Sequence, residues 1–126
     1  MQTTTETGAG SWPTEWLRGA LGVFVVHVIA SGPTYGYAIA SALADAGFGT
    51  VKGGTLYPLL ARLEERGLVE VEWRAGDGGP GRKFYALTTA GRAEHEAQSA
   101  HWLDFTVLTH TFLSHPAPPA SQKEQP

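Results

Sequence analysis

The stretch GGTLYPLLARLEERGLVEVEW, residues 53–73, changes its hydrophobic spacing halfway along, and this change constrains the fold more than any other feature of the chain. Its first part carries leucines at positions 56, 59, 60 and 63, the i, i+3, i+4, i+7 spacing of a helix with one buried face. In its second part Val69, Val71 and Trp73 alternate with charged residues, a pattern typical of a half-buried strand. Gly67 lies between the two parts, at the left-handed position that ends many helices. The stretch therefore predicts a helix followed at once by a strand.

Two more helices are predicted upstream of this stretch. Residues 15–30 are apolar on nearly every side, so their helix should be buried on two sides. Thr14 can cap its start, and Gly32, followed by proline, should end it. Residues 34–46 carry an apolar stripe at helical spacing and should form the second helix, with Gly47 as its terminator.

The remaining elements surround a glycine-rich loop. Thr55 follows a glycine pair and is the expected N-cap of the third helix, which places Pro58 in the first turn. Residues 75–81, AGDGGPG, predict a turn, and residues 82–87, RKFYAL, predict the strand that returns from it. A final helix is expected from about Thr88-Thr89 to Leu113.

This order of elements predicts a mainly α fold with a small β-hairpin, in the winged helix-turn-helix arrangement. The predicted organisation is a disordered N-terminus (1–11), a winged-helix DNA-binding domain (12–88), a C-terminal dimerisation helix (89–115) and a disordered tail (116–126). The last helix is too long to lie within so small a globule, so it is free to pack against a second copy.

Composition and charge narrow the functional classes. The net charge of −3 and the pI of 5.9 weigh mildly against a nucleic-acid partner, which usually requires a basic excess. The most apolar run, residues 22–30, is far shorter than the roughly 18 to 20 residues of a bilayer span, and the polar N-terminus has no basic signal region. We therefore expect a cytoplasmic protein that does not enter a membrane.

The chain offers little chemistry for catalysis or for metal binding. It has no cysteine, no nucleophile elbow and no phosphate-binding loop, so we predict a non-enzyme without catalytic residues or cofactor. His95 and His101 are six positions apart, which does not bring two imidazoles to one helix face, so no metal site is expected. His27, within the apolar run, is interpreted as a hydrogen-bonded core or interface residue.

Three motifs, GPTYGYAIASAL, GGTLYPLLARLEERGLVEVEW and GGPGRKFYALTTAG, occur in this order, and residues 17–102 resemble the PadR family of bacterial transcriptional regulators. The resemblance implies a homodimer that binds palindromic, double-stranded operator DNA, usually as a repressor. With one helix after the wing, the chain is similar to the short-C-terminal branch of the family. Some members of that branch release DNA when flat aromatic or phenolic compounds bind near the dimer interface.

The burial of the leucine stripe leaves the other side of the third helix free for a DNA groove. The residues expected at DNA on this basis, and by the resemblance, are Tyr35, Lys52, Gly54, Thr55, Tyr57, Pro58, Arg62, Arg82 and Lys83. Each also has a purely structural reading. Arg62 could pair with Glu65 or Asp77, Thr55 could serve only as a cap, and Tyr35 could simply pack. The second helix has no lysine or arginine and the wing has one basic pair, so the chain is less basic than many family members at both places.

The resemblance also implies interface and effector residues. The residues expected to bind a small aromatic effector are Phe24, Trp102 and Phe105. The residues expected at the dimer interface are Leu17, Leu21, Trp102, Phe105, Leu108 and Phe112. Plain interface packing is the alternative for Trp102, because aromatic residues are enriched at interfaces. A winged-helix adaptor that binds protein through the third helix, and no DNA, is the alternative function.

Overall fold

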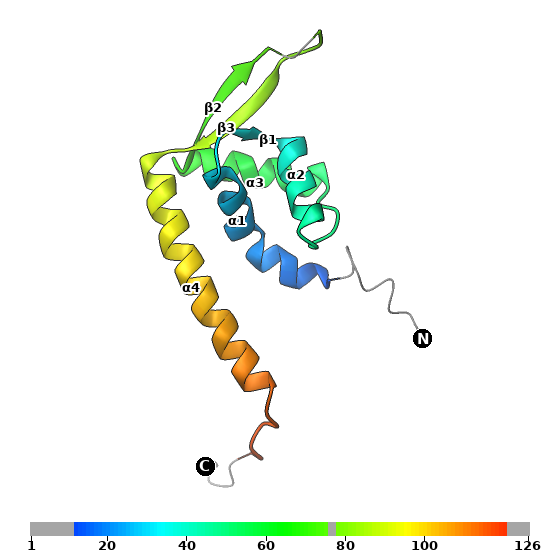
Figure 1. Cartoon of the computed structure of the whole chain (residues 1–126), viewed down its shortest axis with the longest axis vertical. Coiled ribbons are helices and arrows are strands. Elements are labelled where there is room, and N and C mark those ends of the chain that lie inside the picture. Colours follow the sequence, from blue (N-terminus) through cyan, green and yellow to red (C-terminus); the bar gives the residue numbers. More distant parts are fainter. Residues whose placement is uncertain (1–11, 76–77, 121–126) are drawn as a thin grey trace, which may run out of the picture.

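The computed structural model describes residues 12–75 and 78–120 and confirms the predicted mainly α, winged-helix architecture (Figure 1). The elements in chain order are α1 (Thr14–Ala30), β1 (Thr34–Tyr35), α2 (Gly36–Asp45), α3 (Gly53–Glu65), β2 (Val69–Arg74), β3 (Arg82–Leu87) and α4 (Thr89–Leu113). α1, α2 and α3 form a bundle, and the sheet lies at one end of it (Figure 1). α4 leads away from the sheet, and its C-terminal end runs clear of the other helices (Figure 1). The predicted disorder of residues 1–11 and of the end of the tail lies outside the described residues.

The core is built around α1, which packs against α2, α4 and β3. Val25 and Ile29 of α1, Ile39 of α2, and Leu56 and Leu60 of α3 are almost completely buried. Burial of a side chain of this size contributes about 1.5–3 kcal/mol. The apolar surroundings of α1 confirm the prediction that it is buried on more than one side.

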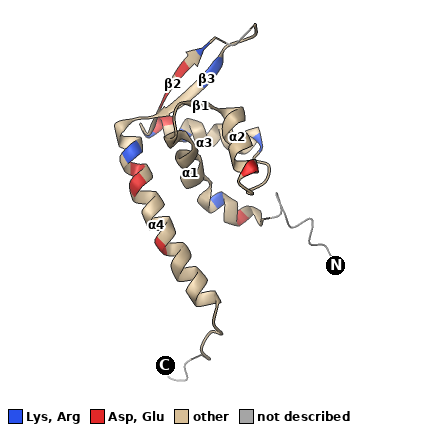
Figure 2. Cartoon of the chain, in the orientation of Figure 1, with Lys and Arg blue, Asp and Glu red and all other residues tan. Residues whose placement is uncertain are grey.

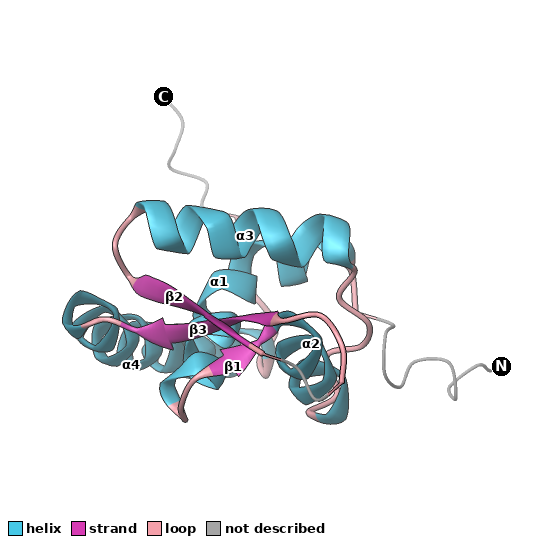
Figure 3. Ribbon diagram, turned by 90° about the horizontal axis from the view of Figure 1, so that it is seen from above, coloured by secondary structure: helices cyan, strands magenta, loops and turns pink. Residues whose placement is uncertain are grey.

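The sheet has one strand more than the predicted hairpin. Its order is β1-β3-β2 and all pairs are antiparallel, with Tyr35 opposite Phe84 and Trp73 opposite Lys83 (Figure 3). The prediction that residue 34 begins the second helix is therefore wrong by two residues. Thr34 and Tyr35 follow Pro33 in extended conformation and pair with β3, a segment too short for periodicity to reveal.

The core-facing side chains of β2 become more exposed toward the tip of the hairpin. Val69 is buried and Val71 is partly buried, but Trp73 is 70% exposed. The hairpin extends beyond the helices, so none of the described helices covers its outer end (Figure 1). The prediction of a half-buried strand therefore holds for the start of β2 and is wrong for Trp73.

The predicted N-caps of α1 and α3 are wrong. Thr14 is the first residue of α1, and Pro13 holds the cap position. α3 begins at Gly53, and the carbonyl of Lys52 accepts hydrogen bonds from the N–H groups of Thr55 and Leu56 at 2.9 Å each. Pro58 consequently lies in the second turn, where its missing N–H removes one helical hydrogen bond. Gly53 and Gly54 are helical although glycine is a poor helix former, so the sequence pattern placed the start of α3 two residues too late.

The turn after α3 is tied to the start of α4. Gly67 adopts φ +75°, as predicted for the end of the helix. The Thr88 hydroxyl donates to the Gly67 carbonyl at 2.6 Å and accepts from the Gly91 N–H at 3.0 Å. A Cβ at Gly91 would collide with the Leu68 carbonyl, so α4 begins directly against this turn. The predicted start of the last helix is confirmed, and Thr88 is its cap.

Candidate nucleic-acid interface

α3 presents the two faces that its spacing predicts. Leu56, Leu60 and Leu63 are buried against the rest of the domain, and Leu59 is partly buried. Tyr57 is 51% exposed, and the neighbouring outward positions, Pro58, Ala61 and Arg62, are also exposed. The outward side of α3 is therefore uncovered by the described parts of the chain.

Four of the residues expected at DNA meet around one surface hollow between α3 and the hairpin. The hollow is lined by Tyr35, Gly36, Tyr37, Tyr57, Trp73, Gly81, Arg82 and Lys83. Tyr57 lies so close to Gly36 that a Cβ at this position would overlap the phenol oxygen. Gly36 therefore lets the first turn of α2 approach the outward side of α3.

Arg82 and Lys83 lie on opposite faces of β3, because side chains alternate along a strand. The Arg82 guanidinium stacks over the Tyr35 ring, 4.5 Å from its centroid. Lys83 shares its face with Trp73 on the neighbouring strand and with Tyr85, whose ring centroid is 5.9 Å from the Lys83 ammonium. The two basic residues can thus reach different parts of a ligand at the hairpin.

Burial raises the pKa of the Tyr85 phenol above its ordinary value of 10.0, and the charges of Tyr57 and Glu64 raise it further. Tyr85 is 3% exposed and packs in the core. Lys83 is therefore a surface cation that lies close to the buried, neutral ring of Tyr85.

Lys52 and Thr55 line a second hollow, on the other side of the start of α3. It is formed with the N-terminal half of α1 and is lined by Thr14, Leu17, Arg18, Leu21, Thr50, Val51, Lys52 and Thr55. Gly54 and Arg62 are exposed and line neither hollow. Six of the nine expected DNA-binding residues thus form two groups beside α3, and Gly54, Pro58 and Arg62 lie outside both hollows.

Basic side chains are available at this surface. Arg66 pairs with Glu94 at 3.5 Å and Arg74 with Glu72 at 3.4 Å. Within residues 12–75 and 78–120, the side chains that make no ion pair include those of Lys52, Arg62, Arg82 and Lys83. Figure 2 shows basic residues near the outer ends of β2 and β3, beside acidic residues of β2.

Three exposed residues of this surface were missed by the sequence analysis. Tyr37 (75% exposed) and Trp73 line the hollow with Tyr57, and Arg18 lies beside Lys52 in the second hollow. Trp73 was assigned to the core side of its strand, and nothing in the sequence showed where the helices stop covering the hairpin. Arg18 was not predicted because most of the residues around it in α1 are apolar.

The aromatic residues expected to bind an effector come together at the seam between α1 and α4. The Phe24 ring stacks on the Phe48 ring, with 4.5 Å between the ring centroids. It meets the Trp102 ring edge-on, with 6.1 Å between the centroids. The ring centroids of Phe105 and Trp102 are 5.6 Å apart, but Phe105 does not line the adjacent pocket. That pocket is lined by Trp12, Trp16, Leu17, Ala20, Phe24, Phe48 and Trp102. Trp12, Trp16 and Phe48 were not predicted for it.

The residues expected at a dimer interface divide into exposed and buried ones. Phe105, Leu108 and Phe112 of α4 are 51–64% exposed, and Leu17 and Trp102 are partly exposed. Leu21 is only 6% exposed and belongs to the core of the domain. The expectation that Leu21 contacts a partner is therefore corrected, because its side chain is already buried by its own chain.

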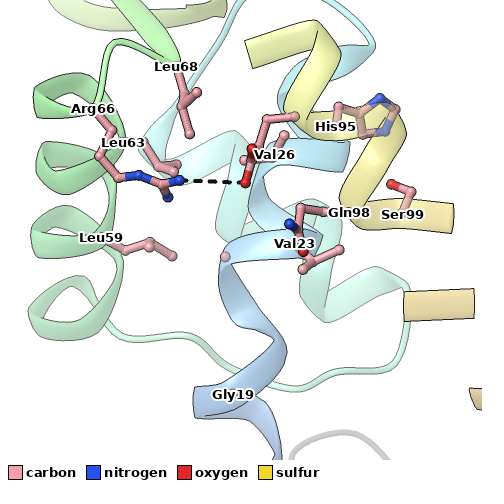
Figure 4. Close-up of a pocket in the computed structure, with 12 residues that line it drawn as sticks. Gly19, Val23, Val26, Leu59, Leu63, Arg66, Leu68, His95, Gln98 and Ser99 are labelled. Atoms are coloured by element: carbon pink, nitrogen blue, oxygen red, sulfur yellow. Dashed lines mark ion pairs between the residues drawn. The ribbon is translucent and has the colours of Figure 1, made fainter. Parts of the chain in front are cut away.

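A cavity of about 250 Å³ separates α1, α3 and α4 (Figure 4). Its walls are partly apolar, with Val23, Val26 and Leu63 among them, and the side of α4 contributes polar residues, including Glu94, which pairs with Arg66 (Figure 4). No helix in the described part of the chain is both long and apolar enough to cross a membrane.

Comparison with known proteins agrees with this architecture. Residues 25–97 match the family described as "Transcriptional regulator PadR-like family". The chain is similar to the transcriptional regulator Rv3488 of Mycobacterium tuberculosis (strain ATCC 25618 / H37Rv), with 39% identity over 79 residues, 63% of this chain and 72% of that protein.

Two crystal structures extend the likeness. The PadR-like transcriptional regulator BC4206 from Bacillus cereus strain ATCC 14579 superposes with a TM-score of 0.74 at 29% identity, over 82% of this chain and 100% of that one. A PadR family regulator from Eggerthella lenta DSM 2243 superposes with a TM-score of 0.70 at 33% identity, over 81% of this chain and 88% of that one. This chain belongs to the PadR-like family of transcriptional regulators.

Proposed function

We propose that this chain binds operator DNA as a homodimer and represses transcription until a small aromatic effector releases it. The observation that carries the proposal is the uncovered outward side of α3, with Tyr57 half-exposed above a completely buried Leu56 and Leu60. A helix exposed in this way has the width that fits the major groove.

The hairpin supplies the contacts that position such a helix. Phosphate contacts fix register and orientation, and they come mostly from basic side chains, hydroxyls and backbone N–H groups. Arg82 and Lys83 lie at the base of the hairpin loop, and Lys52 precedes α3. These residues flank the outward side of α3, so they are suited to the two phosphate backbones beside one groove.

The homodimer is proposed from the surface of α4. Its C-terminal half has no charged residue after Asp104, and exposed apolar side chains cover it (Figure 2). Exposed patches of this kind mark interaction sites in water. A two-fold pair of these helices would place two copies of α3 in successive major grooves, about 34–36 Å apart.

The effector is proposed from the aromatic pocket between α1 and α4. Its tryptophan and phenylalanine rings suit a flat aromatic ligand, since such rings prefer stacked or edge-on neighbours. A ligand in this seam would change how α4 is oriented relative to the DNA-binding domain. A change of about 1–3 kcal/mol in DNA affinity is enough to switch a promoter.

A footprint on the DNA upstream of the protein's own gene tests the proposal. We expect a protected, palindromic site for the natural chain, and loss of protection for Ala61→Glu, which puts a negative charge on the exposed side of α3. Ala97→Glu, the same change at an exposed position of α4, should leave the footprint intact. Binding of no duplex at low salt would overturn the proposal and support the protein adaptor.

A further inference from the structure

Two histidines meet across the seam between α1 and α4. The Nδ1 atom of His27 and the Nε2 atom of His95 are 3.0 Å apart, although the residues are 68 positions apart in sequence. Their ring centroids are 5.2 Å apart and the ring planes are inclined by 31°. His27 is exposed and His95 is partly exposed. The expected hydrogen bond of His27 is thus present, but at the surface and with a histidine as its partner.

This separation is also the one that two imidazoles need to share a metal ion. With metal–nitrogen bonds of about 2.05 Å, two neighbouring ligands are about 2.9 Å apart at a right angle and about 3.3 Å apart in a tetrahedron. The observed 3.0 Å is a hydrogen-bond distance that lies between these two values, so the two rings are already as far apart as a shared ion requires. The ring that donates its N–H in this hydrogen bond would change to its other tautomer, and a rotation of both rings would then point the two nitrogen lone pairs toward one common point.

The geometry points to a surface site for a divalent first-row transition metal ion, held by His27 and His95 as adjacent ligands with water in the other positions. Imidazole suits copper, nickel and zinc, and tetragonal geometry with nitrogen and oxygen ligands is typical of Cu²⁺ and Ni²⁺. We therefore infer that the site takes up copper and nickel ions and neither Mg²⁺ nor Ca²⁺, which select oxygen ligands.

The surroundings fit a site with two protein ligands. In residues 12–75 and 78–120 no group of three or more histidine, cysteine, aspartate or glutamate side chains could hold a metal ion. The exposure of His27 leaves room for coordinated water. His95 also lines the cavity between α1, α3 and α4, whereas His27 does not, so the two rings meet at the edge of that cavity (Figure 4).

An ion at this place would join α1, which lies within the bundle, to α4, which leads away from it. Two ligands on one rigid scaffold bind an ion more tightly than either alone, because the second bond forms within one molecule. The imidazoles must be neutral to bind, so protons should compete with the metal as the pH falls.

Titration calorimetry of the untagged protein with NiCl₂ and CuCl₂ tests the site without reference to DNA. We expect one ion per chain, and a loss of affinity of about 100-fold when His27→Gln or His95→Gln removes one ligand. His101→Gln and His110→Gln, on exposed parts of α4, are the matched controls and should bind like the natural chain. Melting followed by circular dichroism in EDTA verifies that each variant is folded.

Direct evidence comes from NMR, where Cu²⁺ should broaden the imidazole signals of His27 and His95 before those of the other histidines. The inference is overturned if the natural chain binds neither ion, or if folded His27→Gln and His95→Gln bind as tightly as the controls. Selective broadening of His101, His110 or His115 would likewise overturn it.

Discussion

The guanidinium of Arg82 lies 4.5 Å from the centre of the Tyr35 ring, so the first strand of the sheet supports a basic residue of the hairpin. β1 is only two residues long, yet it pairs with β3 and brings this ring under the arginine. The short strand thus connects the start of α2 to the wing, and the Tyr35 ring contributes to the proposed interface by supporting Arg82.

Replacing Tyr35 with leucine should weaken operator binding by about two- to fivefold, the equivalent of one exposed cation–π contact. Fluorescence anisotropy with a labelled duplex measures this change. Tyr35→Phe keeps the ring and should bind like the natural chain. An equal loss in Tyr35→Phe would assign the effect to the hydroxyl and contradict the supporting role of the ring.

Replacing Leu108 with aspartate should convert the proposed dimer into a monomer, because it buries a charge in an apolar interface. Sedimentation equilibrium distinguishes the two masses. His110→Asp places the same charge on the opposite side of α4 and should leave the dimer intact. A natural chain that sediments as a monomer at micromolar concentration would contradict the proposed pairing.

Replacing Gly91 with alanine should lower the free energy of unfolding by about 1–3 kcal/mol, the usual cost of forcing an atom into a packed site. The new methyl group would collide with the Leu68 carbonyl. Gly19→Ala is the matched control, since nothing lies within 4 Å of the added Cβ in α1. It should be neutral or stabilising by about 0.5–1 kcal/mol, as measured by urea denaturation.

Stability should fall as the pH rises above about 10, in part because of Tyr85. Its pKa is raised in the folded state by burial, so the folded protein holds this proton at a pH where the unfolded chain releases it. Stability supplied by such a group is complete below the unfolded pKa and is lost as the pH rises through the folded one. Urea midpoints at pH 7 and pH 11 should differ less for Tyr85→Phe than for the natural chain. Equal differences would contradict this account.

The sequence predicted the elements that have a clear period. The leucine spacing of α3, Gly67 at its end and the start of α4 directly after its cap Thr88 are all as expected, because each depends on local chemistry. β1 was missed since two residues carry no period. The exposure of Trp73 was missed because it depends on how far the helices extend under the hairpin.

The candidate site was predictable to a similar extent. The outward side of α3 followed from its buried side, so Tyr57 and Arg62 lie where they were expected. The stacking of Arg82 on Tyr35 and the meeting of His27 with His95 depend on tertiary contacts between distant segments. Spacing within a single helix could not reveal either contact.

The salt dependence of operator binding tests most directly whether this surface reads DNA. Affinity should fall steeply with salt concentration, and the slope of its logarithmic plot should decrease by about one in Arg82→Ala and in Lys83→Ala, because each removes one phosphate contact. Arg92→Ala, on α4, is the control and should keep the slope of the natural chain. Slopes that are unchanged in both hairpin variants, or an affinity that does not depend on salt, would contradict the account.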